Sequence, residues 1–116
     1  MTINKMSHEN LSESKRLIYA LTRGENRLVK NLSDNENLTP LCWVEFHDTN
    51  ARGEEHDVLA VMTEELGVVS TISETFKREF YDMWNLMEGE AFQFHTVHGT
   101  TKAGREFITC TMVVNE

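Results

Sequence analysis

The sequence predicts a mainly β protein in which one helix separates the third from the fourth of five strands. Two observations lead to this prediction: five stretches are rich in strand-forming residues, and one segment has the apolar spacing of an amphipathic helix. The length of 116 residues and the 40% share of hydrophobic residues suit one domain with a single core.

The N-terminal third is expected to hold little regular structure. Its expected elements are a polar, mobile tail at residues 1–12, a helix at 14–22, a short turn at 28–32 and a polar loop at 33–37. The helix is predicted from the spacing of Leu17 and Leu21, and Gly24 supplies a stop. We therefore divide the chain into an N-terminal segment, residues 1–37, and a barrel domain, residues 38–116.

After residue 38 the pattern changes from helical to extended. The expected strands are residues 41–47, 58–63, 68–71, 91–98 and 106–114. Pro40, the only proline, stands just before the first strand, where its missing N–H group is tolerated. Polar, glycine-containing stretches at 48–55 and 99–105 are typical of hairpin loops.

Residues 73–87 form the one clear amphipathic helix, and Gly89 ends it. Thr71 and Glu74 have capping-box spacing, which places the start near residue 72. An apolar stripe recurs at helical spacing at Phe76, Phe80, Met83 and Met87. We expect this stripe to be buried against strand residues, namely Val44, Leu59 or Val61, Ile108 and Met112.

This element order is that of an OB-fold barrel. We therefore predict an OB-fold-like five-stranded barrel with one helix between strands 3 and 4, plus a short helical N-terminal segment. Other small β-barrels, or an open sheet with one covering helix, have nearly the same order of elements.

The formal net charge of −8 is unevenly distributed. Residues 1–31 hold six basic and three acidic side chains, whereas residues 32–116 hold five basic and 16 acidic ones. An acidic body argues against a large footprint on duplex DNA but allows a narrow positive groove. Because the two parts attract each other, we expect the N-terminal segment to pack across an open sheet edge or to reach over bound DNA.

Several classes of protein are disfavoured by the sequence. No apolar run approaches the roughly 18 residues of a membrane-spanning helix, and the N-terminus lacks the apolar stretch of a secretory signal, so we expect a cytoplasmic protein without a membrane partner. Two cysteines are too few for a disulfide framework or a structural zinc site. A metal site made of Cys42, His47, His95 and Cys110 has no support in their spacing, and no catalytic motif is present. We therefore expect no enzyme, no metal and no cofactor.

Two strands carry an aromatic side chain that points away from the predicted core. Trp43 lies opposite the face formed by Cys42, Val44 and Phe46, and Phe107 lies opposite the apolar face of the last strand. Aromatic rings outside a barrel core are stacking platforms for single-stranded nucleic acid, because every base has a π-face.

Basic side chains occupy the two predicted hairpin loops. Arg52 lies in the first loop, and Lys102 and Arg105 lie in the last. In an OB-fold these loops flank the oligonucleotide channel. The residues alone leave a second interpretation equally open, in which Trp43 packs under the N-terminal segment and the loop cations serve solubility.

Two motifs, in order, resemble a known family. The helix entry Ser70-Thr71-Ile72-Ser73-Glu74-Thr75 is followed by an alternating strand, residues 91–98, and by Gly99-Thr100-Thr101-Lys102-Ala103-Gly104-Arg105-Glu106-Phe107. Over residues 68–112 this combination resembles the single-stranded DNA-binding replication proteins of small tailed phages with protein-primed linear genomes. The similarity is thin over residues 38–67 and absent from residues 1–37.

The resemblance implies an OB-type fold that coats displaced single strands during genome replication, without sequence preference and without catalysis. Implied partners are single-stranded DNA, other phage replication proteins and further copies of the chain, in the host cytoplasm. Stacking by aromatic residues near the first strand is also implied, and Trp43 and Phe46 are the candidates. Some relatives have an aromatic residue just before the helix entry, where this chain has Val69. The predicted DNA-binding residues are Trp43, Phe46, Arg52, Lys102, Arg105 and Phe107.

Two other functions remain open from the sequence. A small acidic phage protein can inhibit a host nucleic-acid enzyme by presenting carboxylates in place of DNA phosphates, and the charge of residues 32–116 supports this alternative. An interaction protein without a nucleic-acid role would use Trp43 and Phe107 in a protein interface.

Overall fold

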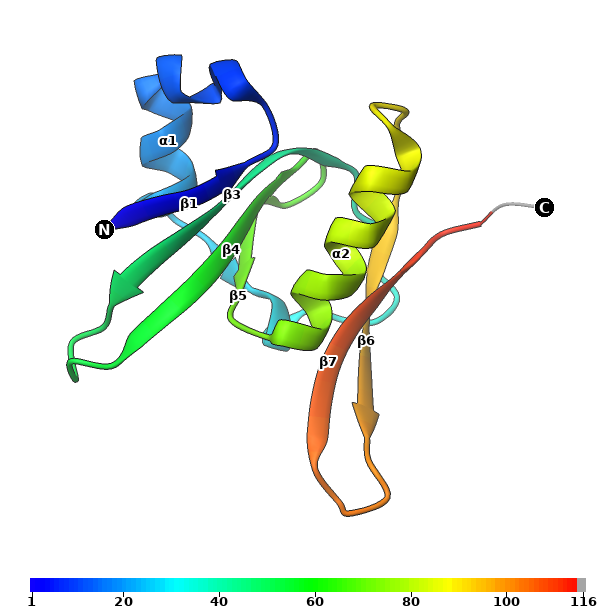
Figure 1. Ribbon diagram of the computed structural model, residues 1–116. Helices are drawn as coiled ribbons and strands as arrows, with labels where there is room; N and C mark the ends of the chain where they lie inside the picture. Colours follow the sequence, from blue (N-terminus) through cyan, green and yellow to red (C-terminus); the bar gives the residue numbers. More distant parts are fainter. Residues whose placement is uncertain (115–116) are drawn as a thin grey trace.

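A computed structural model describes residues 1–114 (Figure 1). The predicted end of the barrel domain at residue 116 lies outside the described residues. In chain order the elements are β1 (Thr2–Met6), η1 (Glu9–Glu13), α1 (Lys15–Thr22), β2 (Arg27–Leu28), η2 (Val29–Asn31), β3 (Pro40–Thr49), β4 (Glu55–Thr63), β5 (Gly67–Thr71), α2 (Glu74–Met87), β6 (Phe94–Thr100) and β7 (Glu106–Met112).

The protein is mainly β, as the sequence predicts, with 40% of residues in strands and 26% in helices. A five-stranded sheet has the order β1-β3-β4-β5-β2, and β6 pairs with β7 in a separate hairpin. Within residues 1–114 the two sheets are linked by an isolated bridge between Leu38 and Phe94, and the strands do not form one closed ladder. Figure 1 shows the tip of the β3–β4 hairpin at the lower left and that of the β6–β7 hairpin at the bottom, on either side of the start of α2.

The N-terminal segment is part of the sheet, so the prediction of a mobile tail is wrong. β1 pairs antiparallel with β3, placing Thr2 opposite His47, and β2 pairs parallel with β5, placing Arg27 opposite Val69. An edge strand has unpaired backbone groups, and β1 supplies partners for those of β3. Of the two predicted placements of this segment, packing across a sheet edge is the one that these strand pairs confirm.

Helix α1 begins and ends where the sequence predicts. The hydroxyl of Ser14 caps it by accepting a hydrogen bond from the Leu17 amide. The helix lies against one face of the five-stranded sheet, where a buried apolar layer forms. This layer contains Leu11, Leu21, Cys42, Val44, Phe46, Ala60 and Val68.

Helix α2 also matches its predicted range, but a different residue caps it. The Ser73 hydroxyl accepts a hydrogen bond from the Phe76 amide at 3.2 Å, and the Thr71 hydroxyl accepts one from the Ser73 amide. The predicted Thr71–Glu74 capping box is therefore wrong. The helix ends at Met87, and Gly89 follows with a φ of +91°, a conformation that glycine adopts easily.

The second buried layer lies between α2 and the opposite face of the sheet. Phe76 and Phe80 are fully buried there together with Leu59 and Val61, as predicted, and Ile108 packs against them. Met83, Met87 and Met112 are only half-buried. The predicted contact of this layer with Val44 is wrong, because the sheet is covered on both faces and Val44 belongs to the layer under α1.

Candidate nucleic-acid interface

The loops of the two hairpins have the same construction. Each of the stretches 50–54 and 101–105 begins with a polar side chain and has glycine at its fourth position, with φ of +81° and +84°. The Asn50 carboxamide oxygen accepts hydrogen bonds from two amides of its loop, at 2.9 and 3.0 Å. The Thr101 hydroxyl accepts one from the Arg105 amide at 3.1 Å. These bonds fix the loop backbones, which leaves the remaining side chains free to face solvent.

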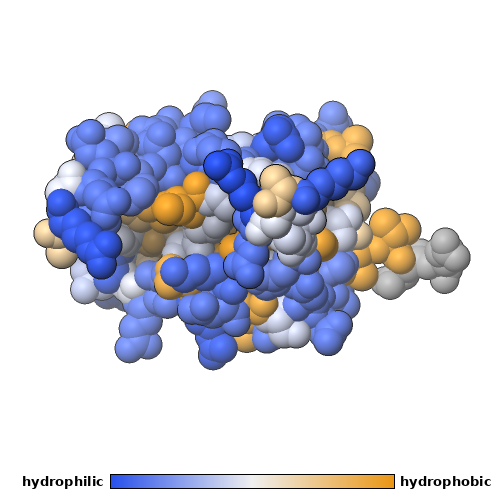
Figure 2. Space-filling model, turned by 90° about the horizontal axis from the view of Figure 1, so that it is seen from below, coloured by the Kyte–Doolittle hydropathy of each residue, from blue (hydrophilic) through white to orange (hydrophobic). Residues whose placement is uncertain are grey.

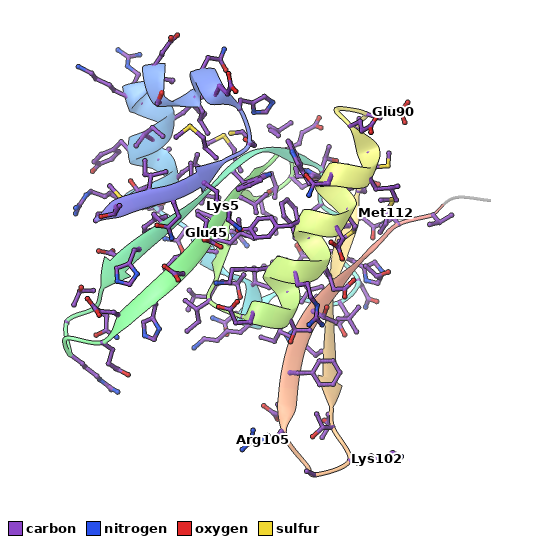
Figure 3. The ribbon with its side chains drawn as sticks, in the orientation of Figure 1. Lys5, Glu45, Glu90, Lys102, Arg105 and Met112 are labelled. Carbon is purple, nitrogen blue, oxygen red and sulfur yellow. The ribbon has the colours of Figure 1, made fainter. Side chains whose placement is uncertain are left out.

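The predicted basic residues are exposed on these loops. Arg52 lies in the β3–β4 loop, and Figure 3 shows Lys102 and Arg105 at the tip of the β6–β7 hairpin, far from α2. Glu54 and Glu55 follow Arg52 after a single glycine. The β6–β7 loop therefore has the stronger positive potential of the two.

One groove lies between the two hairpins. It consists of a cleft of about 710 Å³ and an adjoining pocket of about 370 Å³, which share Lys30, Ser73 and Ile108 in their linings. Val58 of the β3–β4 hairpin lines the pocket, and Phe107 of the β6–β7 hairpin lines the cleft. Seen from below, apolar side chains lie in a hollow bordered by polar ones (Figure 2). We call the two together the inter-hairpin groove.

Phe107 is the predicted aromatic residue that the structure places in this groove. Its half-buried ring lines the larger cleft. The ring also covers Gly99, its partner across the hairpin, so closely that a Cβ atom on Gly99 would lie 2.2 Å from the ring. Contact with a glycine backbone orients the ring without covering it completely.

Trp43 lies on the predicted face of β3 but is not available for stacking. Its side chain is only 7% exposed and packs beneath α2 against three aromatic residues. The ring centroids lie 5.0 Å from Tyr81, 6.1 Å from Trp84 and 6.3 Å from Phe80. The prediction that Trp43 stacks on bases is therefore corrected: α2 covers the face that was expected to meet solvent.

Phe46 is likewise unavailable, with 4% of its surface exposed. It belongs to the apolar layer under α1, together with Val44 and Cys42. The alternation of side chains along β3 places Phe46 on the face of the sheet that α1 and the rest of the N-terminal segment cover. The prediction that Phe46 stacks on bases is corrected for this reason.

Leu28, Lys30 and Ile72 are among the groove residues that were not predicted from the sequence. Leu28 and Lys30 come from the segment that was predicted to be a tail and a short turn, and Ile72 lies between β5 and α2. The one sequence feature that pointed to this segment was its positive charge beside an acidic body. Leu28 and Ile72 are 43% and 52% exposed, so their aliphatic side chains are accessible in the groove.

A histidine fixes the wall of the groove near Lys30. The His98 ring contacts the Asp34 carboxylate through Nδ1 and the Lys30 carbonyl through Nε2, the latter at 3.0 Å. The hydrogen bond to Asp34, and then that to the Lys30 carbonyl, raises the pKa of His98. The hydrogen bond from His98 in turn lowers the pKa of Asp34. The imidazolium form can donate both bonds, which ties the chain at residues 30–34 to β6.

The cysteines do not form a reactive or metal-binding centre in the described chain. Cys42 and Cys110 are buried in different apolar layers, and burial raises the pKa of both thiols, that of Cys110 to about 12. Over residues 1–114 there is no group of three or more metal-ligating side chains. None of the helices described here has the length and apolar character needed to cross a membrane.

Comparison of the chain with protein-family models, with curated proteins and with solved structures finds no match.

Proposed function

We propose that this protein binds single-stranded DNA in the inter-hairpin groove and has no catalytic activity. The observation that carries the proposal is that one groove, lined by segments far apart in the sequence, combines an aromatic ring, aliphatic side chains and a lysine. A single strand exposes both the faces of its bases and its phosphates, so it needs such a mixed surface. The motif resemblance over residues 68–112 supports the same function and implies a role in phage genome replication, in the host cytoplasm.

We further propose that the fold is an open form of the OB-fold. Strands β3, β4 and β5 form a meander, α2 follows, and β6 and β7 form a hairpin, which is the OB-fold order. The isolated bridge to Phe94, the first residue of β6, comes from Leu38, two residues before the start of β3. The loops that bind oligonucleotides in OB-folds correspond to those of the β3–β4 and β6–β7 hairpins, and Val58 and Phe107 of these hairpins line the groove.

The distribution of charge suggests which side of the groove meets the phosphates. Lys102 and Arg105 lie on the β6–β7 loop, whereas Arg52 has Glu54 and Glu55 as neighbours. We therefore expect the backbone of the strand to follow the β6–β7 side. Because the net charge is −8, binding of one molecule is expected to be weak at physiological salt and strong only where successive molecules cooperate.

The test is titration of a labelled oligo-dT with the purified protein at low salt, measured by fluorescence anisotropy. Phe107→Ala should weaken binding by about 5- to 150-fold, since stacking contributes on the order of 1–3 kcal/mol per base. Lys102→Gln should lower the slope of log affinity against log salt by about 0.7, the value for one phosphate contact.

Matched controls come from α1, which lies outside the groove. Tyr19→Ala removes an aromatic ring that is 63% exposed, and Lys15→Gln removes an exposed lysine; neither should change affinity. Absence of any binding to oligo-dT at low salt and micromolar protein would show that the proposal is wrong. Inhibition of a host nucleic-acid enzyme by the acidic surface would then replace it as the leading hypothesis.

A further inference from the structure

The inter-hairpin groove has two chemically different halves. The smaller pocket is apolar, with Leu28, Val58, Ile72 and Ile108 in its lining. The larger cleft is more polar and includes Asn31, Thr75, His98, Thr100 and Glu106. Lys30 belongs to both linings and therefore lies where the two halves meet.

Leu28 and Ile72 are the two exposed aliphatic residues of the apolar half. Hydrogen bonds of the chain segments around them fix their positions. Leu28 pairs with Ser70 of β5 in parallel register, and the Ser70 hydroxyl donates a hydrogen bond of 2.6 Å to the Asn26 side chain. Ile72 lies between Thr71 and the Ser73 cap of α2, and the Ser73 hydroxyl donates to the Ile108 carbonyl at 2.8 Å. Strand β2, the α2 entry and β7 are therefore tied together around this pocket.

Lys30 lies at the boundary of the two halves, and its ammonium group is free of ion pairs in the described chain. Its side chain is exposed, and within residues 1–114 no carboxylate lies within 4.0 Å of its ammonium group. Its backbone carbonyl is held by the His98 ring. The ammonium group can therefore bind an anion next to an apolar pocket without first breaking an ion pair.

We propose that Leu28 and Ile72 form an aliphatic subsite for a nucleobase and that Lys30 binds the adjoining phosphate. This inference rests on the proposed function and adds the N-terminal segment to the interface. A nucleotide has an apolar base face beside an anionic phosphate, and the groove presents an apolar pocket beside an unpaired lysine in the described chain. The strand would thus contact an aromatic ring at Phe107 and aliphatic side chains at Leu28 and Ile72.

Two serine variants test the subsite in the full-length protein with oligo-dT as the probe. Leu28→Ser and Ile72→Ser should each weaken binding by about fivefold, since covering an exposed aliphatic side chain removes apolar surface from water. Their salt dependence should equal that of the wild type, because no charge is lost. Lys30→Gln should instead lower the salt slope by about 0.7.

Leu86→Ser is the matched control, because Leu86 is 75% exposed near the end of α2 and outside the groove. Its affinity should equal that of the wild type. Methyl NMR of the unmodified protein gives a measurement that does not depend on folding of a variant. Oligo-dT should shift the methyl resonances of Leu28 and Ile72 and leave those of Leu86 unchanged.

The outcomes separate the subsite from the proposed function. If the wild type binds and Phe107→Ala weakens binding, but the serine variants bind normally and the methyl resonances do not move, the subsite is wrong and the function stands. If the wild type does not bind oligo-dT, both are wrong. If the serine variants alter self-association of the free protein at unchanged DNA affinity, the pocket is a protein interface and the subsite is wrong.

Discussion

The ring of Phe107 occupies the space that a side chain on Gly99 would need. A Cβ atom added to Gly99 would lie 2.2 Å from Cζ of the ring, although the two residues are ordinary partners across β6 and β7. A glycine in a strand normally lowers stability, and an aromatic residue that covers it compensates for the missing side chain. The pairing of these two residues therefore sets the position of the one aromatic ring that reaches the groove from β7.

Gly99→Ala is expected to destabilise the protein by about 1–3 kcal/mol, because the ring must leave its place. In the Phe107→Ala background the same change should stabilise the protein by about 0.5–1 kcal/mol, the usual gain when alanine replaces glycine in a strand. Urea unfolding of the four proteins measures both values. If Gly99→Ala changes the free energy of unfolding equally in the two backgrounds, Gly99 and the Phe107 ring are not in contact.

The His98–Asp34 pair is expected to make stability depend on pH in two opposite directions. The folded state raises the pKa of His98 above its ordinary value of 6.5, so the contribution of His98 is complete below that value and is lost as pH rises through the raised pKa. The folded state lowers the pKa of Asp34, whose contribution is lost as pH falls through the lowered pKa. The pair therefore stabilises the fold between these two pKa values.

Melting temperatures of the wild type and of His98→Asn, measured across pH, test this expectation. The wild type should exceed the variant most in mildly acidic solution, and the difference should shrink as pH rises. Asp34→Asn should reduce the same difference, and high salt should reduce it further, because both side chains are exposed. A difference that is constant across pH would contradict the assignment.

Phe80→Ala is expected to lower the free energy of unfolding by roughly 3–5 kcal/mol, a large share of the stability of a small domain. Phe80 is fully buried, and its ring centroid lies 5.5 Å from that of Phe94 and 6.2 Å from that of Trp84. Loss of the ring leaves a cavity between α2 and the sheet. Urea unfolding measures the loss, and Leu86→Ala, on the exposed side of the same helix, should cost much less.

Lys77→Met is expected to destabilise the protein by about 3–5 kcal/mol, because it leaves a buried carboxylate without its cation. Lys77 is 3% exposed, and its ammonium group lies 4.0 Å from Glu45, which is 8% exposed. The ammonium group also donates to the Asp57 carbonyl at 3.0 Å. Glu45 accepts a further hydrogen bond from Tyr81, and Figure 3 shows it near Lys5.

The double variant Lys77→Met/Glu45→Gln separates charge from packing in this network. Removing both charges should recover part of the stability that Lys77→Met loses, because burying a neutral amide costs less free energy than burying an unpaired carboxylate. Urea unfolding of both variants supplies the comparison. A double variant less stable than Lys77→Met would contradict the charge argument.

The parts of the fold that local patterns determine could be predicted from the sequence. The spacing of Phe76 and Phe80 gave the phase of α2, and Gly53 and Gly104 belong to hairpin loops that were expected. Strands β1 and β2 could not be predicted in this way, because Thr2 pairs with a residue 45 positions away and no local periodicity reports such pairing.

Of the six residues predicted to bind DNA, Phe107 is the one that lines the groove. Lys102 and Arg105 lie in a loop whose composition identifies it, whereas Leu28 reaches the groove only through pairing with β5. The error on Trp43 has a different origin. Alternation shows which side chains share a face of a strand but not whether that face is covered, and the nearly continuous apolar run from Cys42 to Phe46 is typical of a strand buried on both faces.

Lys30, Ile72 and Ile108 meet in the groove although they come from the early, middle and last parts of the chain. During synthesis the groove is therefore incomplete until β7 has been made and has docked. A nascent or partly unfolded molecule has no groove, so any ligand that occupies the groove stabilises only the finished molecule and shifts the whole folding equilibrium toward it. Binding in the groove and completion of folding are therefore linked equilibria, and each favours the other.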